Sequence, residues 1–438
     1  MGGWKSTLAL LVVLIGLGAY IYFVDSKKPV GDEAKQKVFT GVTLDDIEEL
    51  EVKSNDGERS KVRKADGLWK LVEPVAVDAD QAELGTIASS LPDLEIQRVV
   101  EENPSDLKRY GLDMPRLEVG FRKKGSTDFQ RLTIGEKTPT GNELYARTAD
   151  KKRVILLSSF VDGTFNKNTF ALRDKTVLQF ERDKVSSLEL SSKSGDVQLA
   201  KSGTEWKIVK PISARADFGV IEGIIERLHS LKMQSIVAPD GAAKESNYGL
   251  DKPTGTITVG SGSARATLLL GSTRDAVINA RDASRPMIFT LAPTVTMDVF
   301  KTLTDLRRGD LFDSRSFTAK HIEFRRGDEV IALDKTKGKD EKEIWKKGDG
   351  KDVDATKADD LLNRILSLRA TSFDTAAPSA LKSPQLTVTV RYDEDKTETV
   401  SFARQAEDVV AARSDEPGAA RIMASMFDEA IKALDAVK

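Results

Sequence analysis

The stretch Asp66-Gly67-Leu68-Trp69-Lys70-Leu71 returns as Gly203-Thr204-Glu205-Trp206-Lys207-Ile208 and, more loosely, as Lys342-Glu343-Ile344-Trp345-Lys346-Lys347. The spacing of the tryptophans is 137 residues from position 69 to 206 and 139 from position 206 to 345. Solenoid repeats are far shorter, roughly 20 to 50 residues, so each copy is long enough to fold as a small domain. The sequence therefore predicts three tandem modules rather than one continuous horseshoe.

Other landmarks keep this spacing, which distinguishes a duplication from a chance recurrence of tryptophan. Tyr110-Gly111-Leu112-Asp113-Met114-Pro115 returns 138 residues later as Tyr248-Gly249-Leu250-Asp251-Lys252-Pro253, and it has decayed to Leu381-Lys382-Ser383-Pro384. A strand-like stretch with a central glutamate opens each copy, at 47–52, 185–190 and 321–324. We place repeat 1 at residues 40–181, repeat 2 at 182–318 and the divergent repeat 3 at 319–438.

Repeat 2 shows the expected local structure most clearly. Short apolar strands at 188–190, 197–200 and 206–209 are separated by glycine-containing turns, and Pro211 ends this set. From Asp217 the apolar side chains recur every three or four residues as far as Leu231, the spacing of an amphipathic helix. A second antiparallel set follows the Tyr-Gly turn. We predict an α+β fold in which each repeat is a small, mainly antiparallel sheet with packed amphipathic helices, in the order β-β-β-α-β-β-β-β-α.

The sequence contains no recognisable catalytic motif. His229 and His321 lie in different repeats without partners at metal-ligand spacing, and neither a Gly-x-Ser-x-Gly elbow nor a Walker loop occurs. We interpret the repeated tryptophans as strand residues packed on the helix, because each can bury a large apolar area. Stacking of their indole rings on sugars is the alternative. We therefore predict no catalytic residue, no metal, no cofactor and a protein that is not an enzyme.

One polar series is a candidate for partner binding. Ala146-Arg147, Ala280-Arg281 and Ala412-Arg413 recur before an apolar triplet in each repeat, so the three arginines are expected at the same strand position. Buried beside a carboxylate of its own repeat, each arginine would be an internal ion-pair partner. Projecting into solvent, the three guanidinium groups could instead grip an acidic partner. We favour the internal ion pairs and keep Arg147, Arg281 and Arg413 as possible partner-binding residues.

The N-terminal residues predict a membrane anchor. Residues 7–24 (TLALLVVLIGLGAYIYFV) contain no charge, and eighteen residues are just long enough to cross a bilayer core of about 30 Å. A cleaved signal peptide is the alternative, but the apolar segment is longer than usual and no small-x-small cleavage site follows it. We assign residues 1–28 to a tail and transmembrane helix, which contacts the lipid bilayer through 7–24, and residues 29–39 to a polar tether.

Two sequence signals disagree about the orientation of this anchor. Lysines 27, 28, 35 and 37 follow the apolar segment whereas Lys5 precedes it, and the positive-inside rule alone would keep the bulk of the chain in the cytoplasm. A very short tail before a single apolar segment is nevertheless typical of a signal anchor, and large domains translocate despite nearby charge. We expect the bulk of the chain outside the cytoplasm. The absence of cysteine fits either compartment.

The overall charge argues against a nucleic-acid partner. The chain has 31% charged residues but a formal net charge of only −2, so no strong field would attract a polyanion to the protein as a whole. The residues after the anchor are expected to form ordinary globular domains.

Taken together, the anchor, the Trp-Lys strand, the Tyr-Gly-Leu-Asp-x-Pro turn and the Leu-Arg pairs at Leu172-Arg173 and Leu306-Arg307 resemble the bacterial DUF4340 family. The resemblance covers nearly the whole chain after residue 40 and is weakest in repeat 3, which lacks Tyr-Gly. The family has no assigned activity. The resemblance implies a single-pass inner-membrane protein with its bulk in the periplasm. It also implies an accessory or scaffold role beside ABC-type permeases and gliding-motility-type auxiliary proteins. A periplasmic glycan- or peptide-binding protein is the alternative, and a hydrolase with an unrecognised site is a third hypothesis.

Overall fold

The computed structural model of the protein describes residues 36–240, 243–337, 341 and 343–438. The expected anchor and most of the expected tether lie outside these residues. Within the part of the chain that the structure describes, no helix combines the length and apolar character needed to cross a bilayer. The chain divides into two compact units, one ending at Asp174 and the other running from Lys175 to Lys438.

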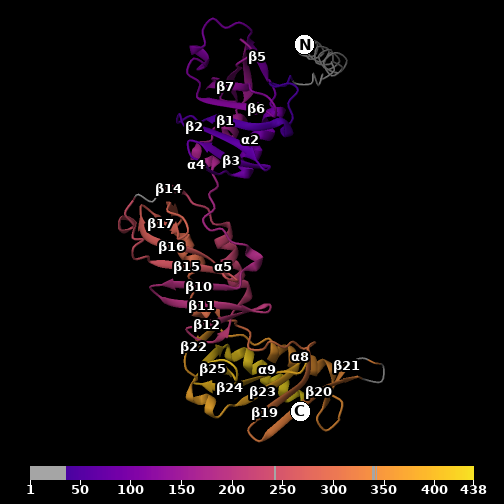
Figure 1. Ribbon diagram of the computed structural model, residues 1–438. Helices are drawn as coiled ribbons and strands as arrows, with labels where there is room; N and C mark the ends of the chain where they lie inside the picture. The colour runs from indigo at the N-terminus through magenta and orange to yellow at the C-terminus, as the bar shows by residue number, and fades with distance from the viewer. Residues whose placement is uncertain (1–35, 241–242, 338–340, 342) are drawn as a thin grey trace, which may run out of the picture. The chain divides into compact units, whose positions relative to one another are not determined.

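The first compact unit contains one antiparallel sheet in the order β4-β3-β2-β1-β6-β7-β8-β9-β5 (Figure 1). Its strands are β1 (Ile47–Lys53), β2 (Arg59–Ala65), β3 (Leu68–Glu73), β4 (Val77–Asp78), β5 (Arg98–Glu101), β6 (Leu117–Lys123), β7 (Phe129–Lys137), β8 (Glu143–Thr148) and β9 (Val154–Ser158). Its helices are α2 (Gln81–Asp93), α3 (Phe160–Phe165) and α4 (Thr169–Leu172). The apolar side of α2 packs on one face of the sheet and closes the core.

The second compact unit repeats this plan twice. The sheet of repeat 2 has the equivalent order β13-β12-β11-β10-β15-β16-β17-β18-β14. Its strands are β10 (Ser187–Ser192), β11 (Gly195–Ser202), β12 (Glu205–Lys210), β13 (Ala214–Arg215), β14 (Ser235–Ala238), β15 (Gly255–Ser261), β16 (Ala264–Arg274), β17 (Val277–Asp282) and β18 (Ile288–Leu291). Its helices are α5 (Phe218–Ser230), α6 (Thr294–Val299) and α7 (Leu303–Leu306).

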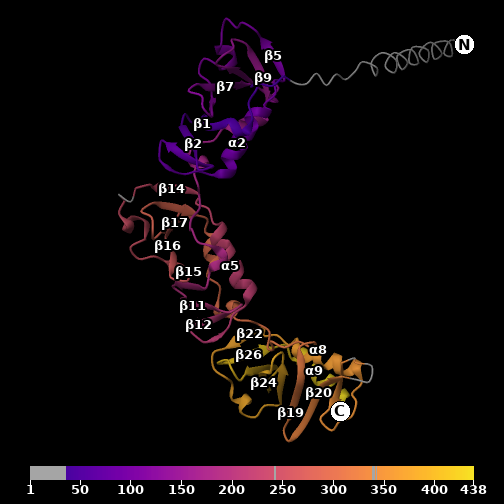
Figure 2. The ribbon, with the colours of Figure 1, turned by 45° about the vertical axis from the view of Figure 1, so that its right-hand side comes forward.

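The sheet of repeat 3 has the order β21-β20-β19-β23-β24-β25-β26-β22, which matches the other two without their two-residue edge strand. Its strands are β19 (Ala319–Arg326), β20 (Glu329–Lys337), β21 (Glu343–Lys347), β22 (Ser372–Asp374), β23 (Leu386–Tyr392), β24 (Lys396–Gln405), β25 (Asp408–Arg413) and β26 (Ala419–Ile422). Its helices α8 (Ala355–Leu366) and α9 (Ala424–Val437) lie side by side (Figure 2). The α+β class and the three repeated sheets predicted from the sequence are therefore confirmed.

Each repeat begins with a short extended segment that pairs with the chain leaving its main helix. The amide of Val38 donates to the Leu94 carbonyl in repeat 1 at 2.8 Å. The same bond joins Val177 to Leu231 and Leu311 to Leu368. Val38 and Phe39, at the end of the expected polar tether, are buried in the core of repeat 1. The backbone pairing of the modules thus starts near residues 36, 175 and 309, upstream of the sequence landmarks.

The repeated tryptophans are core residues, as the packing interpretation predicts. The exposed fractions of Trp69, Trp206 and Trp345 are 4%, 2% and 5%. Trp206 also donates its indole N–H to Glu222 of α5 at 2.9 Å, which ties strand β12 to the helix. Burial of the ring and satisfaction of its one polar atom together fix the helix on the sheet.

The geometry of the Tyr-Gly turn explains why glycine recurs at this position in repeats 1 and 2. Gly111 and Gly249 end short 3₁₀ turns with φ of 64° and 68°, in the left-handed region that glycine adopts without strain. A Cβ atom on Gly249 would also lie 2.8 Å from the backbone nitrogen of Ser272. The turn therefore requires glycine twice over, for its backbone conformation and for the close approach of a neighbouring strand.

We expect Gly249→Ala to lower the free energy of unfolding by about 2 to 4 kcal/mol, because a left-handed alanine and a backbone clash are both costly. Gly262→Ala is the matched control, since φ there is +61° but nothing lies within 4 Å of the added Cβ. The control should cost only about 1 kcal/mol. Equal losses in urea unfolding would show that the close approach to Ser272 contributes nothing.

Candidate functional site

The cross-strand register shows whether the three arginines of the sequence series are equivalent. Val52, Leu190 and Phe324 occupy the same position in the opening strands β1, β10 and β19. Following the pairs outward through two more strands leads to equivalent positions at Leu132, Leu268 and Val400. The next strand then places Thr148, Asp282 and Arg413 opposite those three residues.

The prediction that the three arginines share a strand position is therefore wrong for Arg413. Arg147 and Arg281 are equivalent, but Arg413 lies one residue further along its strand. A shift of one residue turns a side chain to the opposite face of a sheet. Accordingly Arg147 and Arg281 are partly exposed, whereas Arg413 is only 9% exposed on the core side. The doublet Ala411-Ala412 conceals the shift, since Ala411 is the residue that corresponds to Ala146 and Ala280.

The two equivalent arginines make modest local contacts. Arg281 forms an ion pair with Glu245 at 2.5 Å, with side-chain exposures of 22% and 41%. Arg147 instead donates its Nε to the carbonyl oxygen of Lys151 at 3.1 Å. As far as the structure describes the chain, Arg281 and Arg413 share no partner, and of the three arginines only these two have a carboxylate partner.

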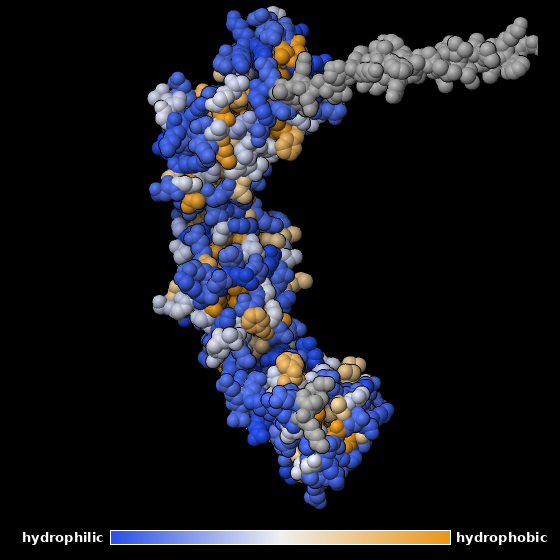
Figure 3. Space-filling view, turned by 90° about the vertical axis from the view of Figure 1, so that its right-hand side faces the viewer, coloured by the Kyte–Doolittle hydropathy of each residue, from blue (hydrophilic) through white to orange (hydrophobic). Residues whose placement is uncertain are grey.

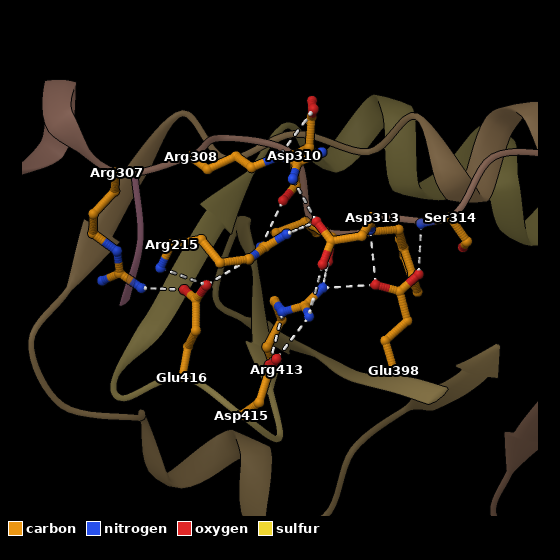
Figure 4. Close-up of polar contacts among 12 residues, drawn as sticks. Arg215, Arg307, Arg308, Asp310, Asp313, Ser314, Glu398, Arg413, Asp415 and Glu416 are labelled. Carbon is orange, nitrogen blue, oxygen red and sulfur yellow. Dashed lines mark hydrogen bonds and ion pairs between the residues drawn. The ribbon is translucent and has the colours of Figure 1, made fainter. Parts of the chain in front are cut away.

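Arg413 lies at the centre of a buried cluster of charges (Figure 4). Its Nη1 donates to Glu398 of the neighbouring strand β24 at 2.8 Å and to the carbonyl oxygen of Leu311 at 2.7 Å. Its Nε and Nη2 bind both oxygens of Asp415, at 2.8 and 2.9 Å. Glu398, whose side chain is 1% exposed, also accepts the backbone amides of Asp313 and Ser314. All three nitrogens of the Arg413 guanidinium group and both carboxylate oxygens of Glu398 are therefore hydrogen-bonded.

A second ion pair joins the cluster from repeat 2. Arg215 of the edge strand β13 donates to Glu416 of repeat 3 at 2.5 Å and to Asp313 at 2.7 Å. Arg307, which follows α7, donates to the other oxygen of Glu416 at 3.0 Å and lies over the ring of Phe373 at 3.9 Å from its centroid. The side chains of Arg307 and Glu416 are 5% and 8% exposed. Glu416 thus bridges two arginines of repeat 2.

The connecting segment between the two repeats supplies the remaining carboxylates. Asp313 lies 2.7 Å from the guanidinium groups of both Arg215 and Arg308, and 3.5 Å from that of Arg413. Asp310 lies within ion-pair distance of the guanidinium groups of Arg308, Arg315 and Arg369. The cluster is therefore a chain of alternating charges that runs from β13 through the connector to the loop after β25.

The charged groups of this cluster pair with one another. Each carboxylate is held by one or more guanidinium groups, and a guanidinium group does not give up its proton in a protein. Burial lowers the pKa of Arg413, but its hydrogen bonds with Asp415 and Glu398 outweigh this and raise it overall. Among the described residues, no three His, Asp or Glu side chains are grouped to hold a metal ion.

Acid should loosen this cluster. Burial raises the pKa of Asp313, but the charges of Arg215 and Arg308 lower it more, so that it lies below its ordinary value of 3.8. A carboxyl group with a lowered folded-state pKa stabilises the fold above its unfolded pKa, and this stabilisation is lost as the pH falls through the folded pKa. We expect the free energy of unfolding of the second compact unit to fall as the pH drops below about 4. Asp313→Asn should flatten the decline, and an unchanged profile in that variant would assign it to other groups.

The sequence does not predict most residues of this cluster. Arg215 and Glu416 are 201 positions apart, and no periodic pattern relates them. The Leu306-Arg307 pair was visible as a family motif without a role. The structure gives it one, because the backbone of Arg307 pairs with Ala216 beside β13, as that of Arg173 pairs with Ala79 in repeat 1.

Comparison with known proteins identifies one sequence relationship. The profile of a family described as a domain of unknown function, DUF4340, matches residues 69–207 and 206–386. No curated protein matches the sequence. Among solved structures, the DNA polymerase sliding clamp from Pseudomonas aeruginosa is 8% identical over 90% of this chain and 94% of that chain, with a TM-score of 0.14. A provisionally assigned 6-phosphogluconolactonase from Bacteroides uniformis is 10% identical over 85% and 83%, with a TM-score of 0.07. Neither score supports an argument about fold.

Proposed function

Because the chain belongs to the DUF4340 family, we propose that it is a non-enzymatic, membrane-anchored envelope protein. In this proposal it acts as an accessory or scaffold subunit of an ABC-transporter or gliding-motility-type export or assembly system, with its bulk in the periplasm. The observation that carries the scaffold role is the buried cluster around Arg413 and Glu416. A scaffold must hold its modules in a fixed relation, and this cluster joins repeats 2 and 3 through paired, largely buried charges.

The composition of the surface supports association through polar contacts. The face seen in Figure 3 is mostly hydrophilic, with apolar side chains scattered over it. Scattered apolar residues are ordinary on a protein surface, whereas a large continuous apolar patch would indicate a hydrophobic interface. A glycan-binding role through the repeated tryptophans has less support, because the buried indole rings cannot stack on a sugar.

Co-purification from gently crosslinked, detergent-solubilised membranes tests the proposal. We expect the full-length protein to bring down a permease or auxiliary membrane protein when that partner is expressed with it. Glu416→Ala would leave Arg215 and Arg307 without their shared carboxylate and should weaken this association, whereas Glu245→Ala, at the exposed pair with Arg281, should not. Recovery of the protein alone under these conditions would refute the scaffold role.

The orientation needs its own test. Alkaline phosphatase fused after Lys438 should be active if the bulk of the chain is periplasmic. An inactive but stably expressed enzyme, together with a fluorescent cytoplasmic reporter at the same position, would reverse the topology.

A further inference from the structure

The outer face of the first sheet, opposite α2, carries an ordered set of charges. Alternate residues of the four adjacent strands β2, β1, β6 and β7 point to this face. Its basic side chains are Lys53, Arg59, Lys61, Arg63, Arg122 and Arg131, and its acidic ones are Glu49, Glu51 and Glu118. On these four strands six basic residues stand against three glutamates, an excess of three positive charges, and Glu73 of the adjoining strand β3 lies opposite Lys61.

Each glutamate on the outer face lies between two basic side chains. Glu49 pairs with Arg63 and with Arg122. Glu51 lies 2.6 Å from Arg131 and 4.0 Å from Lys61. Glu118 binds Arg59 through both carboxylate oxygens, at 3.0 Å each, and also Lys53 at 3.2 Å. Each of these three glutamates is therefore shared by two positive charges.

Three of the six basic side chains are more exposed than the glutamates. The side chains of Glu49, Glu51 and Glu118 are 1%, 28% and 23% exposed. Three arginines around them are far more accessible: the side chains of Arg59, Arg63 and Arg131 are 63%, 53% and 42% exposed. An approaching molecule therefore meets guanidinium groups first, although the glutamates hold those groups in place.

A hollow of about 200 Å³ opens in the middle of this face. Its floor is Gly120, and it is lined by four basic side chains (Lys53, Arg59, Lys61 and Arg131) and by three carboxylates (Glu51, Glu73 and Glu118). The equivalent floor positions in repeats 2 and 3 are Thr258 and Thr389, identified by their pairing with Glu189 and Glu323 as Gly120 pairs with Glu51. There a threonine–threonine hydrogen bond, of 3.0 Å in repeat 2 and 3.1 Å in repeat 3, occupies the same place. In repeat 1 Gly120 has no side chain to fill this space.

We propose that this outer face binds an extended acidic segment of a partner protein, with one carboxylate side chain entering the hollow above Gly120. Arg59, Lys61 and Arg63 alternate along β2, so their spacing is about 6.8 Å, the distance between alternate side chains of an extended peptide. Guanidinium groups bind carboxylates through paired hydrogen bonds. A side chain of a peptide can enter the hollow, whereas the flat surface of a bilayer cannot, and the hollow therefore favours a peptide as the partner. The identity of the partner as a protein of the same envelope complex rests on the proposed function.

Synthetic peptides and the full-length protein in detergent test the proposal. A fluorescent peptide with glutamate at alternate positions should bind, and a peptide with lysine in those positions should not. Arg131→Gln should weaken binding about tenfold or more, because it removes a charge-assisted contact. Arg325→Gln is the matched control, since Arg325 is an exposed arginine at the equivalent of Lys53 in repeat 3 and should leave binding unchanged.

Gly120→Thr tests the hollow itself by introducing the residue found in the other two repeats. Its Cβ would lie 3.3 Å from the flexible Arg131 side chain, so the sheet should fold normally while the hollow is filled. We expect an unchanged thermal unfolding curve and loss of peptide binding. Peptide binding that survives both Gly120→Thr and Arg131→Gln would overturn the proposal, as would binding of anionic phospholipid vesicles without binding of the peptide.

The two proposals fail separately. If a membrane partner co-purifies with the wild-type protein and equally with Gly120→Thr while no acidic peptide binds, the acidic-segment proposal fails and the scaffold role stands. If the acidic peptide binds but the wild-type protein co-purifies with nothing, the scaffold role fails and the outer face remains a binding surface.

Discussion

Replacing Arg413 by alanine is expected to lower the free energy of unfolding of the second compact unit by about 3 to 5 kcal/mol. Removing one member of a buried ion pair leaves the other charge without compensation, and costs of this size are typical. Here the stranded group is Glu398, whose side chain is 1% exposed. Loss of the guanidinium group also leaves the carbonyl oxygen of Leu311 and both oxygens of Asp415 without their donor.

Two further variants separate this effect from a general loss of an arginine. Arg281→Ala breaks a more exposed pair and should cost at most about 1 kcal/mol. Adding Glu398→Gln to Arg413→Ala removes the stranded charge and should restore part of the lost stability, so that the two changes are not additive. Denaturant unfolding followed by tryptophan fluorescence measures all three. An Arg413→Ala protein as stable as the Arg281→Ala protein would mean that the buried pair contributes little.

The repeat architecture could be predicted because its landmarks are constrained by packing. A buried tryptophan and a left-handed glycine tolerate few replacements, so both remained recognisable at Trp69, Trp206, Gly111 and Gly249. The two- to four-residue edge strands could not be predicted, since such short segments show no periodicity. The opening segments at 36–39, 175–178 and 309–312 were missed for the same reason, although their backbone pairing with the helix end is the same in all three repeats.

The candidate sites were harder to predict because they depend on register and on distant contacts. Counting from the Ala-Arg pairs placed Arg413 with Arg147 and Arg281, and only the strand pairing exposes the shift of one residue. The hollow above Gly120 depends on a glycine that resembles any other strand residue in the sequence. Only the strand register shows that Gly120 occupies the position of Thr258 and Thr389 in the other two repeats.

Replacing Trp206 by alanine is expected to be about as damaging as the loss of Arg413, but for a different physical reason. Truncating a buried aromatic side chain costs about 3 to 5 kcal/mol, through lost burial and the cavity left behind. The exposed fraction of Trp206 is 2%, and its indole N–H holds Glu222 on α5, so the variant should loosen the helix from the sheet.

The control Trp206→Phe keeps most of the buried ring and loses the hydrogen bond, which should cost about 1 to 2 kcal/mol. Thermal unfolding followed by circular dichroism distinguishes the two variants, and the partner co-purification assay should be performed on both at a temperature where each is folded. If Trp206→Ala unfolds like the wild-type protein but no longer associates with its partner, the tryptophan is a recognition residue. If both variants lose stability in the expected order and the folded fraction still associates, the repeated tryptophans have been retained because each one holds a helix on its sheet.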